Sequence, residues 1–111
     1  MKDKLDIMPG SLDLLVLHTL ASMGRMHGYG IARRIEQVGA DALILNQGTI
    51  YAALVRLLQG KWIEAEWGTS DNNRKARYYS ITSRGRQRLA EETESWQRMA
   101  DVVRRVLSAA V

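Results

Sequence analysis

The sequence contains no cysteine and one proline, and no apolar run in it reaches the length of a membrane-spanning helix. Without cysteine the chain has no disulfide, no thiolate nucleophile and no cysteine-based zinc site, which fits a reducing compartment. A bilayer span needs ~20 apolar residues, whereas the longest uncharged stretch, residues 42–55, includes Asn46 and Gln47. The amino terminus has mixed charges and lacks the apolar segment of a signal peptide. These absences predict a cytoplasmic protein with no membrane partner.

Side-chain sets that support catalysis or metal binding are also missing. No Ser/His/Asp combination, phosphate-binding glycine loop or carboxylate pair stands out, and His18 and His27 lack metal-like spacing to carboxylates. We interpret both histidines as polar packing or surface residues. The sequence therefore predicts no enzyme activity, no cofactor and no metal site.

Positive charge is concentrated in the middle of the 111-residue chain. The net charge is +4 with a pI of about 9.8, and residues 42–90 hold eight basic and three acidic side chains. Residues 1–41 hold five of each sign, and residues 91–111 hold three basic and four acidic groups. A local basic excess is typical of nucleic-acid binding, although many basic proteins bind no nucleic acid.

Apolar periodicity predicts three helices in the first half of the chain. Ser11 is a plausible N-cap of a helix over residues 12–23, which Gly24 ends. That helix is apolar on two sides, which predicts packing between two partners. A second helix fits residues 29–38 and a third fits residues 47–59, with the β-prone residues 43–45 between them.

Alternating apolar and polar residues then predict two strands, around residues 62–68 and 77–82, joined by a polar, basic turn. Thr82 or Ser83 is expected to cap a final helix that runs to about residue 108. This order predicts an α+β, mostly α fold: a winged helix-turn-helix over residues 1–81, followed by a long carboxy-terminal dimerisation helix over residues 82–111. Residues 43–45 are expected to form the third strand of the wing sheet.

The third helix takes the position of a recognition helix, whose exposed side chains meet base edges in the major groove. Its expected DNA contacts are Gln47, Gly48, Thr49, Tyr51 and Arg56, where Gly48 would let backbone N–H groups approach a phosphate. On the wing the expected contacts are Asn73, Arg74, Lys75 and Arg77. The alternatives are a plain amphipathic core helix with Tyr51 packed inward, and a solvated turn.

The last helix carries an apolar stripe at heptad spacing, interrupted by Glu92, which predicts pairing with a second copy. The expected dimer residues are Leu89, Trp96, Met99, Val103, Val106 and Ala110, with Leu14 and Leu17 from the first helix. The alternative is an intrachain core stripe. Trp96 could also stack a small aromatic ligand, or simply fill the interface.

Four segments together resemble the PadR family of bacterial transcriptional regulators: "HGYGIARRIEQ", "GTIYAALVRLLQGKWIEAEW", "NNRKARYYSITSRGRQRL" and "EETESWQRM". The resemblance spans about residues 11–107 and fits the short subclass with one dimerisation helix. Two departures are Ala52, where many members have proline, and Lys61, where glycine is frequent. The resemblance implies a homodimeric repressor on a roughly palindromic operator, with phenolic acids or other aromatic compounds among the effectors.

We therefore expect a sequence-specific regulator whose partners are double-stranded DNA, a second copy of the chain and a candidate small aromatic ligand. Two alternatives stay open. One is a protein-interaction module that uses the winged helix as a docking surface, and the other is a non-specific nucleic-acid binder.

Overall fold

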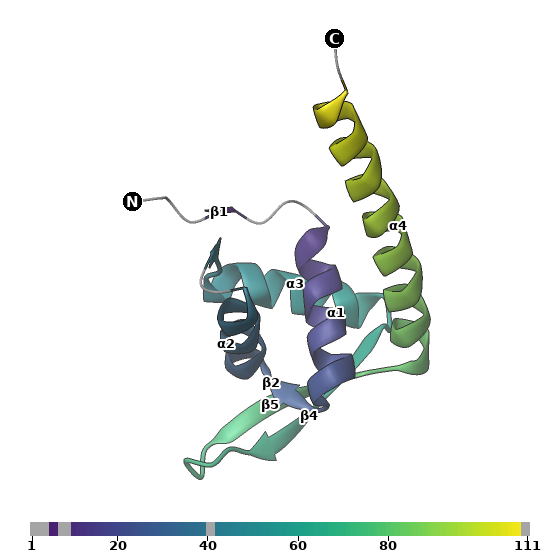
Figure 1. The fold of residues 1–111 in the computed structure, drawn as a ribbon. Helices are drawn as coiled ribbons and strands as arrows, with labels where there is room; N and C mark the ends of the chain where they lie inside the picture. Colours follow the sequence, from purple (N-terminus) through teal and green to yellow (C-terminus); the bar gives the residue numbers. More distant parts are fainter. Residues whose placement is uncertain (1–4, 7–9, 40–41, 110–111) are drawn as a thin grey trace.

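The computed structural model describes residues 5–6, 10–39 and 42–109. Its helices are α1 (Ser11–Met23), α2 (Gly28–Val38), α3 (Gln47–Gln59) and α4 (Ser83–Ser108), and its strands are β1 (Leu5–Asp6), β2 (Met26–His27), β3 (Leu43–Ile44), β4 (Ile63–Thr69) and β5 (Lys75–Ile81). Figure 1 shows α4 on one side of the molecule, with α2 and the tip of the β4–β5 hairpin on the other. The predicted fold, an α+β and mostly helical winged helix with a long last helix, is confirmed.

The helix ends show which capping predictions were right. Thr82 caps α4, since its hydroxyl oxygen accepts a hydrogen bond from the Gly85 N–H at 3.0 Å. Gly24 ends α1 with φ 82°, and its N–H donates to the Leu20 carbonyl at 2.9 Å. The prediction of Ser11 as the N-cap of α1 was wrong. Gly10 takes that position in a left-handed conformation, φ 86°, and Ser11 is the first helical residue.

The wing sheet is antiparallel with strand order β2-β5-β4. The prediction that residues 43–45 supply its third strand was wrong, because Leu43 and Ile44 pair in parallel with β1. The edge of β5 is instead occupied by Met26 and His27, which pair with Tyr79 and Tyr78. Those two residues directly precede α2. The chain therefore supplies the third strand of the wing sheet before α2, and not between α2 and α3.

The core lies between the three-helix layer and one face of the wing sheet. α1 contacts α2 and α3 on one side and α4 on the other, as its two apolar faces predict. The buried apolar residues are Leu12, Val16, Leu17, Leu20, Ile31, Ile35, Ile50, Ala53, Leu54, Leu57, Ile63 and Tyr79. Among the described residues, no helix is both long and apolar enough to cross a membrane.

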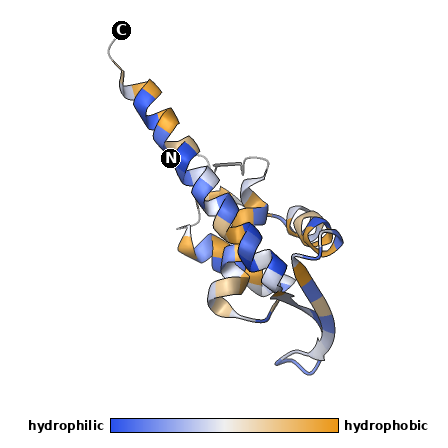
Figure 2. Ribbon diagram, turned by 90° about the vertical axis from the view of Figure 1, so that its right-hand side faces the viewer, coloured by the Kyte–Doolittle hydropathy of each residue, from blue (hydrophilic) through white to orange (hydrophobic). Residues whose placement is uncertain are grey.

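α4 continues well beyond the body of the molecule. Its first turns pack against α1 and β5, and its second half projects away from the other elements (Figure 1), so the longest dimension of the chain is 60 Å. Apolar residues recur along this projecting half, as the orange bands in Figure 2 show. The half of α4 that carries the predicted dimer stripe is therefore uncovered within one chain.

Candidate nucleic-acid interface

The amino-terminal end of α3 is exposed and firmly capped. The Asn46 side-chain oxygen accepts hydrogen bonds from the Thr49 N–H at 2.8 Å and from the Thr49 hydroxyl at 2.9 Å. Gln47, Gly48 and Tyr51 are exposed, and 62% of Tyr51 is accessible, so its ring does not pack inward. The Thr49 hydroxyl therefore already donates its hydrogen to Asn46, whereas Gln47, Gly48 and Tyr51 are open to solvent.

His27 has a defined role that sequence reasoning missed. Its Nδ1 accepts a hydrogen bond from the Gly30 N–H at 3.0 Å, which caps α2. Its ring also lies against two tyrosines, stacked with Tyr29 at 6.5 Å between centroids and edge-on to Tyr78 at 5.7 Å. The available signal was a histidine directly before the glycine that starts the helix. Capping by His27 fixes the start of α2 against the wing.

The two faces of the wing carry opposite charge. In the β4–β5 register, Trp67 lies opposite Arg77 and Thr69 opposite Lys75, on the face that also carries Tyr79. Lys75 Nζ lies 4.9 Å from the centroid of the Trp67 ring. Residues of β4 one position away, Glu64 and Glu66, point to the other face. The basic residues Lys75 and Arg77 therefore lie on the same face of the sheet as the buried Tyr79, in the part of the wing that extends beyond the core.

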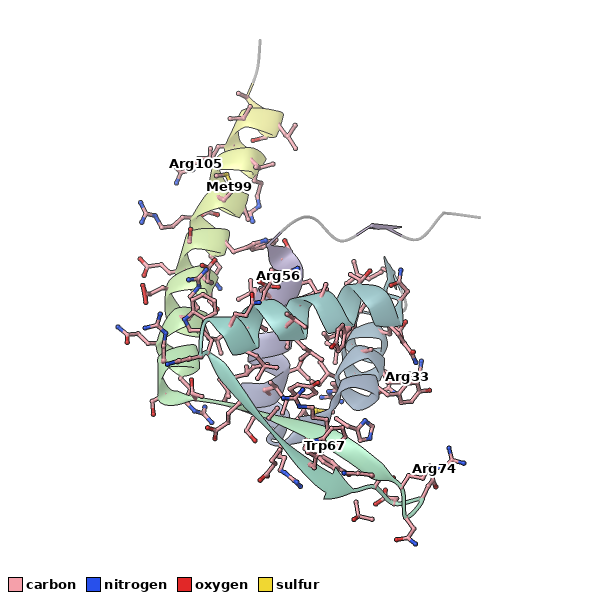
Figure 3. The ribbon with its side chains drawn as sticks, turned by 180° about the vertical axis from the view of Figure 1, so that it is seen from behind. Arg33, Arg56, Trp67, Arg74, Met99 and Arg105 are labelled. Atoms are coloured by element: carbon pink, nitrogen blue, oxygen red, sulfur yellow. The ribbon has the colours of Figure 1, made fainter. Side chains whose placement is uncertain are left out.

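The tip of the wing is a tight turn held by backbone hydrogen bonds. The Ser70 N–H donates to the Arg74 carbonyl at 2.8 Å, and the Asn73 N–H donates to the Ser70 carbonyl at 2.9 Å. Asn73 has φ 59°, a left-handed conformation that asparagine tolerates better than most residues. Arg74 is exposed at this tip, with α3 crossing the molecule above the wing (Figure 3).

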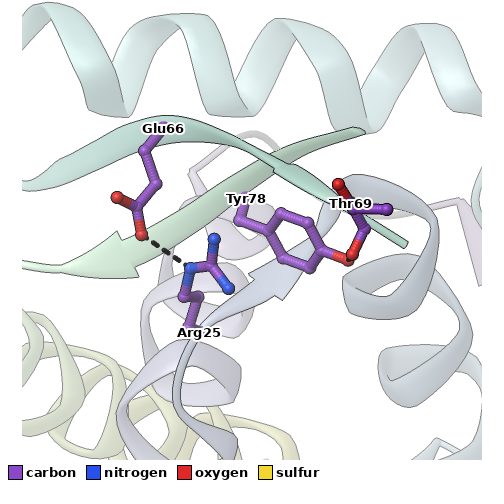
Figure 4. Close-up of polar contacts among 4 residues, drawn as sticks. All are labelled: Arg25, Glu66, Thr69 and Tyr78. Carbon is purple, nitrogen blue, oxygen red and sulfur yellow. Dashed lines mark hydrogen bonds and ion pairs between the residues drawn. The ribbon is translucent and has the colours of Figure 1, made fainter. Parts of the chain in front are cut away.

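A cluster on the face of the wing that carries Glu64 and Glu66 braces strands β4 and β5 (Figure 4). Arg25 Nε donates to Glu66 Oε1 at 2.7 Å, and its guanidinium lies 4.1 Å from the centroid of the Tyr78 ring. The Tyr78 hydroxyl donates to the Thr69 carbonyl at 3.3 Å. The sequence offered no signal for this cluster, because Arg25 and Glu66 are 41 positions apart. It joins the wing to the segment between α1 and β2.

Arg56 lies at the other end of α3, in its last turn. Its guanidinium binds both carboxylate oxygens of Asp13, with Nη2–Oδ1 2.7 Å and Nε–Oδ2 3.3 Å. This hydrogen bonding to Asp13 raises the pKa of Arg56 above its ordinary value. Figure 3 shows Arg56 beside α1 and far along the molecule from Arg74. A base contact by Arg56, as expected from the sequence, would have to compete with this ion pair.

Two arginines near the start of α4 make specific contacts. Arg84 Nε donates to the Gly60 carbonyl at 2.9 Å. The Arg88 guanidinium lies 4.3 Å from the centroid of the Trp62 ring and pairs with Glu92 at 3.0 Å. These contacts join α4 to the turn that follows α3.

The predicted dimer residues that the structure describes fall into three groups. Trp96, Met99, Val103 and Val106 are exposed on the projecting half of α4, with accessible fractions from 46% to 68%. Leu14 and Leu89 are partly buried, and Leu89 packs against the core. Leu17 is only 1% exposed and is enclosed by the chain's own core. Ala110 lies outside the described residues.

A helix pair with an exposed second helix, beside a hairpin with a basic face, is the arrangement of a winged-helix DNA-binding protein. The PadR-like transcriptional regulator family matches residues 16–91, and the chain belongs to that family. At the level that the family defines, the chain is therefore a DNA-binding transcriptional regulator. An uncharacterized protein of Lysinibacillus sphaericus is 31% identical over 98 residues, covering 88% of this chain and 89% of that protein.

Solved structures agree with this assignment. A PadR-like transcriptional regulator from Bacillus cereus has a TM-score of 0.76 and 28% identity, covering 91% of this chain and 95% of the other. A PadR family regulator from Clostridium difficile has a TM-score of 0.75 and 27% identity, covering 89% of this chain and 100% of that one. A transcriptional regulator from Clostridium thermocellum has a TM-score of 0.79 and 25% identity, covering 86% and 92%.

Proposed function

We propose that the chain is a sequence-specific transcriptional repressor that binds a pseudo-palindromic operator as a homodimer. The proposed contacts with DNA rest on the separation of charge between the two faces of the wing. Lys75 and Arg77 share the face that continues outward from the core, whereas Glu64 and Glu66 point the other way. In this arrangement Gln47, Gly48 and Tyr51 read or approach the major groove, while Asn73, Arg74, Lys75 and Arg77 follow the phosphates.

The dimer part of the proposal is supported by the projecting half of α4. Large apolar residues exposed together on the half of α4 that projects away from the other elements indicate a partner surface. Their heptad spacing favours a helix of the same kind, and a twofold axis would place two recognition helices for one operator. Under this proposal residues 1–81 bind DNA, and residues 82–111 hold the two protomers together.

The proposal also includes regulation, by a small aromatic effector that binds at Trp96. Trp96 is 53% exposed near the middle of α4, so a second copy that pairs with this helix would cover it together with any ligand stacked on it. Such a ligand would act by changing the distance between recognition helices, which must be about one turn of DNA, ~34–36 Å, apart.

Footprinting on the promoter of the chain's own gene tests the proposal. We expect protection of two half-sites related by a dyad, and reduced transcription from that promoter when the protein is added. A protein-interaction module would give no protection, and a non-specific binder would protect the DNA without a preferred position.

A further inference from the structure

Trp67 is a large aromatic side chain that stands in solvent on the wing. Its accessible fraction is 62%, although it belongs to β4 and lies two residues before the strand ends. Figure 3 shows Trp67 on the wing, nearer to the body of the molecule than Arg74 at the tip. A single exposed apolar residue is ordinary on a protein surface. The meaning of Trp67 therefore depends on its neighbours.

Two cations flank Trp67 on its face of the sheet. Arg77 is directly opposite Trp67 in the β4–β5 register, and Lys75 Nζ lies 4.9 Å from the centroid of the Trp67 ring. Both cations are exposed, and no acidic residue in the described part of the chain forms an ion pair with either. An apolar partner would desolvate these charges at a high cost. An anionic polymer that also exposes apolar surface is therefore the better match.

The wing holds Trp67 at a defined distance from the start of α3. Two residues earlier on the same face, Ala65 is opposite Tyr79, which lines one opening together with Gln47 and Tyr51. A strand rises ~3.3 Å per residue, so Trp67 is ~7 Å farther out along the wing than Ala65. The major groove is ~12 Å wide, and about half of this width separates its centre from its edge. With α3 in the groove, Trp67 therefore meets the sugar–phosphate strand at that edge.

We propose that the Trp67 ring packs on a deoxyribose of this strand, while Lys75 and Arg77 bind the phosphates on either side of that sugar. The contact rests on the proposed function, because it requires α3 to lie in the major groove. A contact to the sugar carries no sequence information directly, so it fixes the position of the wing on any duplex. It also releases no counterion, unlike the contacts of the two cations.

Salt titrations separate the ring from its charged neighbours. Binding of the full chain to a mixed-sequence duplex, about two helical turns long, is measured at about 50–200 mM salt. We expect Trp67→Thr, which keeps a β-branched residue in the strand, to bind about tenfold more weakly with an unchanged salt slope. Lys75→Ala should instead lower the slope by about one unit. Trp67→Phe should stay within about threefold of the wild type. Ser80→Ala, a neutral change on the other face, should match it.

Fluorine NMR of the chain labelled with fluorotryptophan locates the contact without a destabilising variant. The chain has three tryptophans, and Trp67→Phe identifies the Trp67 signal by its loss. We expect the duplex to shift this signal and to leave that of Trp62 in place, because Trp62 lies against Arg88 of α4, 4.3 Å from its ring centroid. A Trp67 signal that does not move when the duplex is bound would overturn the proposal, even if Trp67→Thr does not fold.

Three further results decide the matter. Equal binding by Trp67→Thr and the wild type would overturn the proposal. A loss that brings the reduced slope of Lys75→Ala would also overturn it, because the ring would then only position Lys75. Tighter binding to a single strand than to the duplex would indicate stacking on bases in place of a sugar contact. If the wild type binds no duplex, the proposed function fails together with this contact, whereas the results for Trp67→Thr leave the proposed function intact.

Discussion

Asp13 in the first turn of α1 and Arg56 in the last turn of α3 form a two-pronged ion pair, with the shorter contact 2.7 Å long. The pair joins α1 to the carboxy-terminal end of α3. Its position therefore gives Arg56 a structural task beside the base contact expected from the sequence.

A double-mutant cycle of Asp13→Asn and Arg56→Gln measures this task. Arg56 is 52% exposed and Asp13 28% exposed, so we expect a coupling free energy of about 0.5–1 kcal/mol in urea unfolding. We also expect the operator preference of Arg56→Gln to match that of the wild type. A changed preference at one base pair, with no coupling to Asp13, would instead favour base reading by Arg56.

Gly85 should tolerate no side chain. A Cβ built there would lie 2.0 Å from the Trp62 carbonyl oxygen and 2.7 Å from Ile81 Cγ1. Because backbone would have to move, we expect Gly85→Ala to lower the free energy of unfolding by about 1–3 kcal/mol. Chemical unfolding followed by circular dichroism measures the loss. A stability equal to that of the wild type would contradict the tight packing of α4 on the turn after α3.

Gly48→Ala, like Gly85→Ala, replaces a helical glycine by alanine. We expect it to lower the affinity for DNA while leaving the stability of the fold nearly unchanged. Its Cβ would meet only the Asn46 side-chain oxygen, at 3.3 Å, and alanine favours helix. We expect the free energy of unfolding to change by less than about 0.5 kcal/mol. Affinity for DNA should nevertheless fall by about tenfold, or ~1.4 kcal/mol, because a methyl group would keep a phosphate away. Unchanged affinity in fluorescence anisotropy would remove Gly48 from the interface.

Tyr79 should make the fold less stable at alkaline pH. Burial raises the pKa of Tyr79, and the charge of Arg77 only partly opposes this. Above pH ~10 the unfolded chain loses the hydroxyl proton while the folded chain keeps it, so stability falls as pH rises. We expect Tyr79→Phe to reduce this alkaline loss in unfolding experiments from pH 9 to 11. An unchanged slope would show that Tyr79 ionises equally in both states.

Val103→Lys should dissociate the proposed dimer. Val103 lies in the middle of the exposed stripe on α4, where a charge facing a second copy would be costly to bury. We expect monomers in sedimentation velocity, with the helical content of the wild type retained. Arg105→Ala, on the opposite side of the helix, serves as the control and should stay dimeric. A dimer that persists in Val103→Lys would exclude the stripe as the interface.

Sequence reasoning succeeded where a single residue type sets the local structure. Gly24 and Thr82 bound their helices as expected, because a terminating glycine or a capping hydroxyl acts over a few residues. It failed for the third wing strand, because a two-residue strand is chosen by which sheet edge is free and not by its own sequence. The ion pairs Arg25–Glu66 and Asp13–Arg56 were missed because their partners are 41 and 43 positions apart in the sequence.

The same limit applies to the candidate site. The exposure of Tyr51 and the stripe on α4 followed from helical periodicity. Leu17 was placed at the dimer surface because both faces of α1 are apolar, yet the chain's own core encloses it. Periodicity identifies an apolar face, but it does not say whether the face is covered by the same chain or by another.

Selection of binding sites from a pool of randomised duplexes tests the central claim most directly. The purified chain is incubated with the pool at moderate salt, and the retained DNA is sequenced. We expect enrichment of an inverted repeat with half-site centres about 10–10.5 base pairs apart, and loss of that enrichment for Val103→Lys. Retention of DNA without any enriched sequence, or enrichment of a single half-site that Val103→Lys leaves unchanged, would contradict the proposal of a sequence-specific dimer.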